Sequence, residues 1–249
     1  MDSIVHIKSI NQLHKLAKIG SSKHPLYSIY RFEDLTSKEI TIPLKYTYGF
    51  YQIGLKKDLE GYIKYGRKQY DFQEGVLGFS APLQIIEVSP DIISKASGFT
   101  LMFHKEYIAG SSLEAKFDEY SFFSYAVAEG LHLSLEEEQN IIKIFENIET
   151  EYNLPIDQHS KEVVIANLEL LLTYAKRYYK RQFVIRNDAK PDILKSFEKE
   201  LKIYYYGKED VALPSVEYFA DKLHLSSNYL SDLLKATTGK TTLEHIHFQ

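Results

Sequence analysis

The chain contains no cysteine and no tryptophan among its 249 residues. The absence of cysteine excludes disulfide scaffolds, thiol nucleophiles and cysteine-ligated zinc or iron–sulfur centres. No stretch approaches the ~18–20 consecutive apolar residues of a membrane span, and the first residues lack the basic and apolar regions of a signal peptide. We therefore expect a soluble, cytoplasmic protein that does not contact a membrane.

Histidine is missing from the whole stretch between Pro25 and Phe103. A metal site of clustered imidazoles and a carboxylate therefore cannot form there. His245 and His247 lie near the other end of the chain and on different faces of a helix. No phosphate-binding or dinucleotide-binding glycine pattern occurs. We expect no metal, no cofactor and no catalytic activity.

Charge and composition are ordinary for a globular chain. Thirty basic and 34 acidic residues give a formal charge of −4, so any nucleic-acid role must be local. Twelve glycines, seven prolines and 44% hydrophobic residues argue against disorder. The length suits one large domain or two modest ones.

The first half of the chain has the pattern of a β-structure rich in tyrosine. After a short helical pattern from Ser9 to Ile19, the region from His24 to His104 alternates polar and apolar residues between closely spaced turn signals, which predicts an antiparallel β-barrel. Inward aromatic side chains can line a small-molecule pocket or simply fill the barrel, with Arg31 or Arg67 as an anion partner. The candidate effector-binding residues are Tyr30, Tyr46, Tyr48, Phe50, Tyr62 and Phe79.

Helical periodicity begins at Phe117. Ser134 and Glu137 have the spacing of a capping box, and residues 160–183 contain neither glycine nor proline. Two adjacent apolar rows predict one long helix, which either packs wholly on the barrel or also forms a homodimer. The rows are Val164, Leu168, Leu171, Ala175 and Tyr178, and beside them Ile165, Leu172 and Tyr179.

Beyond a break at residues 187–191, three helical patterns follow. Asp192, Ser215 and Ser226 can each cap one, and the last stops at Gly239. A tight turn at His224 between the second and third helices predicts a helix-turn-helix. With Leu230, Leu233 and Leu234 buried, the third helix points outward the polar residues Ser227, Asn228, Ser231, Asp232 and Lys235, side chains that can contact bases or phosphates.

The run from Ser215 to Lys235, followed by Thr238-Gly239-Lys240, resembles the first helix-turn-helix of the AraC/XylS family of transcription regulators. The segment Glu74 to Pro82, with the helical region after it, is similar to the family's cupin-like sensor. The resemblance implies a sensor that binds a small effector, a dimerising helix at 160–183, and DNA binding. It places Asn228, Ser231 and Asp232 at base-reading positions, with Ser227 and Lys240 near the DNA backbone.

Two features depart from that family. Its members carry a second helix-turn-helix after a linking helix, whereas this chain ends where the linking helix should begin. From Pro214 onward, three lysines against four carboxylates leave a net charge of −1. Because DNA affinity comes largely from phosphate neutralisation, we expect residues 1–249 to bind DNA weakly or not at all.

The sequence thus predicts an α+β protein with a cupin-like antiparallel β-barrel at residues 1–116, a helical dimerisation segment at 117–187 and a partial all-α DNA-binding domain at 191–249. The predicted function is effector-responsive transcription regulation. One alternative is an effector-binding and dimerisation module, or decoy, that does not bind DNA itself. Another is a cupin-type metal enzyme, which stoichiometric iron or manganese would indicate.

Overall fold

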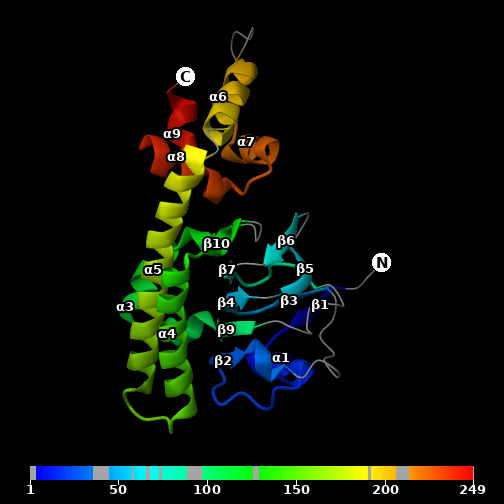
Figure 1. Ribbon diagram of the computed structural model, residues 1–249, viewed down its shortest axis with the longest axis vertical. Coiled ribbons are helices and arrows are strands. Elements are labelled where there is room, and N and C mark those ends of the chain that lie inside the picture. The colour runs from blue at the N-terminus through cyan, green and yellow to red at the C-terminus, as the bar shows by residue number, and fades with distance from the viewer. Residues whose placement is uncertain are drawn as a thin grey trace.

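The computed structural model describes residues 4–35, 45–57, 59–65, 68–72, 75–88, 97–125, 129–189, 192–205 and 213–248. Of these, residues 59–65, 68–72, 87–88, 185–189 and 192 are described by their backbone alone. The chain has a mixed α+β fold in which ten strands come mostly from the first half of the described residues and long helices from the second (Figure 1).

The first half contains the elements β1 (Val5–Ile7), α1 (Ile10–Ala17), β2 (Tyr27–Arg31), η1 (Phe32–Asp34), β3 (Lys45–Tyr48), β4 (Tyr51–Lys57), β5 (Leu59–Tyr65), β6 (Lys68–Phe72), β7 (Val76–Ser80), β8 (Ile86–Val88) and β9 (Ser97–Phe103). The second half contains α2 (Lys105–Ile108), α3 (Ser112–Lys116), η2 (Phe117–Glu119), η3 (Ser121–Ser124), β10 (Leu131–His132), α4 (Leu135–Asn153), α5 (Ser160–Ala189), α6 (Asp192–Tyr205), α7 (Val216–Leu223), α8 (Ser227–Thr238) and α9 (Thr242–His247).

The strands form two open five-stranded sheets instead of the predicted closed barrel. Sheet A has the order β1-β3-β8-β5-β6, and sheet B the order β10-β7-β4-β9-β2. All pairs are antiparallel except β1 with β3. Barrel closure requires strand tilt and stagger to match around the ring, and alternation along single strands does not carry that information.

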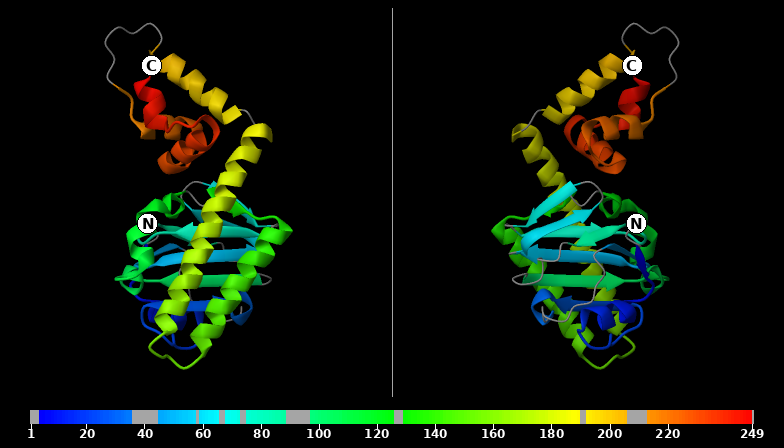
Figure 2. Two further views of the ribbon diagram at one scale, coloured as in Figure 1. Left: turned by 90° about the vertical axis from the view of Figure 1, so that its left-hand side faces the viewer. Right: turned by 90° about the vertical axis from the view of Figure 1, so that its right-hand side faces the viewer.

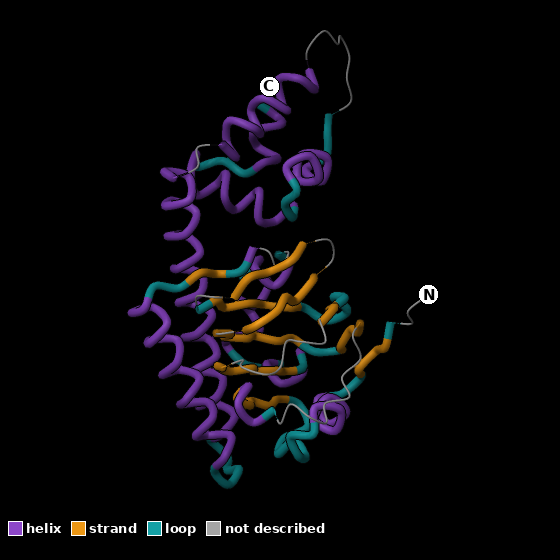
Figure 3. Tube along the Cα trace, turned by 45° about the vertical axis from the view of Figure 1, so that its right-hand side comes forward, coloured by secondary structure: helices purple, strands orange, loops and turns teal. Residues whose placement is uncertain are grey.

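Sheet B is the central layer because both of its faces are buried. On one face, Ile53, Leu77 and Leu101 belong to a large core shared with α4 and α5, where Phe99 stacks on Phe145 at 5.2 Å between ring centroids. The opposite face, represented by Met102, packs within a smaller core shared with sheet A and α1. Figure 3 shows the strands stacked beside the long helices.

The helices α4 and α5 lie side by side across sheet B (Figure 2). The predicted capping box of α4 is confirmed, since Glu137 N donates to Ser134 Oγ at 3.3 Å and Ser134 N donates to Glu137 Oε2 at 2.9 Å. Both predicted apolar rows of α5 are also buried. The wide stripe is therefore needed for packing on α4 and sheet B.

The C-terminal helices α6 to α9 gather at the end of α5 (Figure 1). Their core contains Phe197 from α6, Phe219 from α7, Leu230 and Leu234 from α8, and Ile246 from α9, all at most 1% exposed. The strand β10, from the predicted helical segment 117–187, pairs with β7 and so belongs to sheet B.

Gly98 allows β9 to lie close to β4. Its φ of +117° lies in the left-handed region, and a Cβ atom there would overlap the carbonyl oxygen of Leu55. Strain and overlap act together, so we expect Gly98→Ala to lower the free energy of unfolding by about 3 kcal/mol in urea denaturation. Gly110→Ala is the control, because its φ is +76° but no described atom lies within 4 Å of the new methyl group. Gly110→Ala should lower the free energy of unfolding by about 1 kcal/mol. Equal losses in the two variants would contradict the role of Gly98.

Candidate functional site

The pair α7 and α8 is built by local signals that the sequence carries plainly. Ser215 Oγ accepts from Tyr218 N at 3.1 Å and Ser226 Oγ accepts from Tyr229 N at 3.3 Å, so each serine caps its helix. Between the helices His224 adopts the left-handed conformation, with φ 57° and ψ 39°, and so forms the predicted tight turn. The two helices are separate, and they pack against each other.

The predicted DNA-contacting residues of α8 have different surroundings. Asn228 and Lys235 are exposed, whereas Ser227, Ser231 and Asp232 are half-buried. Ser231 Oγ donates to Thr242 Oγ1 of α9 at 3.2 Å. Lys240, after the helix, is exposed with its Nζ 4.0 Å from the centroid of the Phe248 ring.

Asp232 differs most from the expectation of a free outward face. Its Oδ2 accepts hydrogen bonds from Ser121 Oγ and from Tyr125 Oη, both at 2.5 Å. Burial raises the pKa of Tyr125 above its ordinary value, and the neighbouring Asp232 carboxylate raises it further. Tyr125 therefore keeps its proton and acts as the donor. The side chain of Asp232 points away from the C-terminal core, as expected, but it contacts the region of η3.

Two further residues, Tyr229 and Glu129, hold α8 against the sheet domain, which is the part of the chain from β1 to α5. Neither is among the predicted site residues. The ring of Tyr229 is 1% exposed and packs edge-on against Tyr125 at 5.3 Å and Phe183 at 5.1 Å between centroids. Glu129, which is 2% exposed, accepts from Ser226 N at 2.7 Å and Ser226 Oγ at 2.6 Å. A negative carboxylate is favourable at this position because it faces the positive end of the α8 dipole.

A sequence signal exists for Tyr229 alone. It is a large aromatic residue outside the apolar row Leu230, Leu233 and Leu234 that forms the core of the C-terminal helices. Such a residue must either remain exposed or find a partner elsewhere. No local signal marks Glu129, because its partner Ser226 lies 97 positions away in the chain.

The predicted effector residues divide between the two faces of sheet B. Tyr46, Tyr48 and Phe50 belong to the core between the sheets, and Tyr30 packs against it partly buried. Tyr48 and Phe50 stack with 4.8 Å between centroids. Tyr62 lies in β5, and its side chain falls outside the described residues.

Phe79 and Arg31 face the helices instead. The Phe79 ring contacts Phe122 at 4.4 Å between centroids, and Arg31 Nη2 pairs with Glu149 Oε2 at 2.6 Å. The expectation that Phe79 points inward is therefore wrong. Strand alternation shows which residues share a face but not which face meets which layer, and here both faces are buried. Arg67 lies outside the described residues.

The interior between the sheets also holds polar groups that do not belong to the predicted site. Lys56 is 6% exposed, and burial lowers its pKa to about 8. Thr100, fully buried on β9, has no hydrogen-bond partner for its hydroxyl among the described residues. His14 and Ser28 are joined by a 2.7 Å hydrogen bond between Nε2 and Oγ. The alternation Gln52, Gly54, Lys56 is the sequence signal for the inward lysine.

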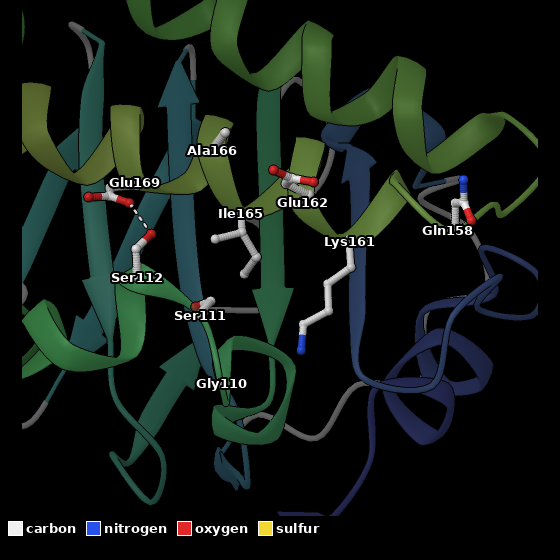
Figure 4. A pocket seen from close by; sticks show the side chains of 9 residues that line it. All are labelled: Gly110, Ser111, Ser112, Gln158, Lys161, Glu162, Ile165, Ala166 and Glu169. Atoms are coloured by element: carbon white, nitrogen blue, oxygen red, sulfur yellow. Dashed lines mark hydrogen bonds between the residues drawn. The ribbon is translucent and has the colours of Figure 1, made fainter.

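A surface pocket of about 500 Å³ lies between α3 and the first half of α5 (Figure 4). Its polar groups are bonded within the protein. Ser112 Oγ donates to Glu169 Oε2 at 2.9 Å, and Lys161 Nζ donates to the carbonyl oxygen of Ala109 at 2.9 Å. Because these groups already have hydrogen-bond partners within the protein, the pocket is a poorer candidate than α8. The lining residues are Gly110, Ser111, Ser112, Gln158, Lys161, Glu162, Ile165, Ala166 and Glu169.

Comparison with known proteins assigns no family, because no protein-family model matches the chain and no curated protein matches it significantly. Within the described residues, no group of three or more histidine and acidic side chains is arranged to hold a metal ion. None of the described helices combines the length and apolar character needed to cross a membrane.

The unpartnered hydroxyl of Thr100 gives a stability prediction. Since a buried polar group without a partner is costly, we expect Thr100→Val to raise the free energy of unfolding by about 1 kcal/mol, measured in urea. Thr242→Val is the matched control, because fully buried Thr242 accepts a hydrogen bond from Ser231. That variant should lose about 1 kcal/mol. A comparable loss in both variants would contradict the prediction.

Proposed function

We propose that this chain is a DNA-binding transcription regulator of the AraC type that responds to a small effector. The observation that supports it best is the local construction of α7 and α8. Two serine-capped helices joined by a left-handed His224 turn present the exposed side chains Asn228 and Lys235. Helices of this arrangement place the second one in the major groove of DNA.

The chemistry of α8 suits base and phosphate contacts in different parts of its exposed stripe. Asn228 and Lys235 are seven residues apart and therefore on the same face of the helix. An asparagine amide can form two hydrogen bonds with adenine, and a lysine ammonium suits a phosphate or guanine. Ser231 and Asp232 keep their proposed base-reading roles, but each would have to exchange an internal hydrogen bond for a contact with DNA.

The effector part of the proposal is supported by the core between the sheets. Tyr30, Tyr46 and Tyr48 line it, and the hydroxyl of Thr100 and the amine of Lys56 are buried on the inner face of sheet B. Sites for small molecules combine apolar walls with a few placed polar groups. Filling of the protein interior by the same aromatic side chains is the alternative.

A homodimer through α5 is also part of the proposal. Although the predicted apolar rows are buried, α5 exposes Val163, Leu170 and Val184, between 41% and 45% exposed, in a row that also contains the exposed Arg177. These positions differ by multiples of seven, the spacing of a seam between two helices.

The dimer predicts a clear response to a charge in this seam. Leu170→Glu should convert the protein from dimer to monomer at micromolar concentration in sedimentation velocity, because it places two carboxylates opposite each other in an apolar contact. Leu154→Glu is the control, since Leu154 is 52% exposed in the loop between α4 and α5 and lies outside this row. A wild-type monomer, or a dimer unaffected by Leu170→Glu, would disprove this interface.

A second candidate function is an effector-binding and dimerisation module, or decoy, without DNA binding of its own. The acidic balance after Pro214 and the internal bonds of Asp232 favour it. Both candidates share the sensor and the dimer helix. Selective binding of a DNA sequence distinguishes them.

Selection from a pool of randomised duplexes at low salt tests the DNA-binding function. We expect weak enrichment of a defined sequence by the unmodified chain. Asn228→Ala should lower affinity for that sequence by about tenfold or more, as expected for loss of a bidentate base contact. Lys235→Ala should weaken all sequences alike and reduce the salt dependence by about one counterion. Failure to enrich any sequence would favour the second candidate, whereas an enriched sequence whose affinity Asn228→Ala leaves unchanged would exclude Asn228 as a base-reading residue.

A further inference from the structure

The contacts around α8 place one flank of the proposed recognition helix against the sheet domain. Along α8, Asn228, Asp232 and Lys235 follow one another at four and three residues, so they share the outward face, and Asp232 lies on the side of that face nearest Tyr229. Its carboxylate accepts hydrogen bonds from Ser121, in η3, and from Tyr125, the residue after η3. The helix α8 also packs on α5, where the rings of Phe183 and Tyr229 meet.

This position leaves no room for DNA on one flank of α8. The major groove is about 12 Å wide, and an α-helix with its side chains is about 10–12 Å across. A helix in the groove is therefore flanked by a sugar-phosphate strand on each side. On one side of α8 that space is filled by η3, Tyr125 and Phe183. DNA and the sheet domain cannot occupy this flank together.

The N-terminus of α8 is occupied as well. The backbone N–H and hydroxyl of Ser226 both donate to the Glu129 carboxylate, at 2.7 and 2.6 Å. Backbone N–H groups at the start of a DNA-reading helix are common donors to DNA phosphates. Glu129 supplies an anion at the place where a phosphate would bind.

We infer that the protein holds α8 in a DNA-excluding position, in which Glu129 occupies its N-terminus and Ser121 with Tyr125 hold Asp232, and that strong DNA binding requires α8 to leave these contacts. The inference rests on the proposed function and specifies how it is regulated. The partner whose access is controlled is duplex DNA. The released helix would regain the Ser226 donors, the Asp232 carboxylate and a free flank for the groove.

The contacts are well placed to respond to the core between the sheets. The element η3 packs on β7, where Phe79 meets Phe122 and Phe123. On β7, Phe79 lies between Gly78 and Ser80, whose positions face the opposite side of sheet B. A change in that core would therefore reach η3 through the single strand β7.

Two release variants test the inference without altering the exposed stripe of α8. Glu129→Ala removes the acceptor at the N-terminus of α8. The double variant Ser121→Ala with Tyr125→Phe removes both donors to Asp232 and leaves the net charge unchanged. Glu106→Ala controls for the charge lost in Glu129→Ala, because Glu106 is an exposed carboxylate on α2. The wild type, the two release variants and the control are all studied as the full 249-residue chain.

Hydrogen–deuterium exchange of residues 226–232 reports release, and titration of a randomised duplex pool and of any enriched sequence reports DNA binding. We expect faster exchange and about tenfold or greater affinity in both release variants, the size of a typical coupling between sites. Glu106→Ala should behave like the wild type. Unchanged exchange in both release variants would show that these contacts do not hold α8, and the inference would be wrong.

The remaining outcomes separate the inference from the proposed function. Faster exchange with no gain in affinity, while the wild type selects a sequence, would overturn the inference and leave the function standing. Faster exchange with no sequence selected by any of the proteins would overturn the DNA-binding function, and the inference with it.

Discussion

The contact between α8 and the sheet domain determines what the C-terminal helices can do. An α-helix has a limited circumference, and α8 uses three parts of it. Leu230 and Leu234 face α6, α7 and α9, Tyr229 faces Tyr125 and Phe183, and Asn228 with Lys235 faces solvent. Only the last part is free to meet a partner. Any macromolecule that needs more of α8 must compete with residues of the same chain.

The same contact connects two parts of the protein that are far apart in sequence. Tyr125 sits in the segment after η3, and it contacts both Tyr179 of α5 and Tyr229 of α8. Because η3 also packs on β7, this aromatic group joins sheet B, α5 and the C-terminal helices. Burial of such rings stabilises the assembly, whereas the hydrogen bonds of Asp232 and Glu129 fix its orientation.

Sheet B explains why the alternation of the strands alone does not separate inner from outer residues in the first half. A sheet with one solvated face shows which face is inside by its polar alternation. In sheet B, Phe79 and Phe99 lie on the face that packs on the helices, and Met102 lies on the face that packs on sheet A. Both faces are therefore apolar. Tyr46 and Tyr48 lie in the core between the sheets, because they are on β3 of the other sheet, where burial alternates along the strand.

Local signals in the sequence were sufficient for the helices and their ends. The caps at Ser134, Ser215 and Ser226 and the turns at His224 and Gly239 depend on neighbours within a few residues, so they could be identified from the chain alone. The buried rows of α5 follow from helical period in the same way. The tertiary structure alone decided that the sheets stay open, that Phe79 faces the helices, and that Glu129 and Asp232 fasten α8. Those features join residues about 40 to 110 positions apart, and no periodicity or spacing encodes which distant partners meet.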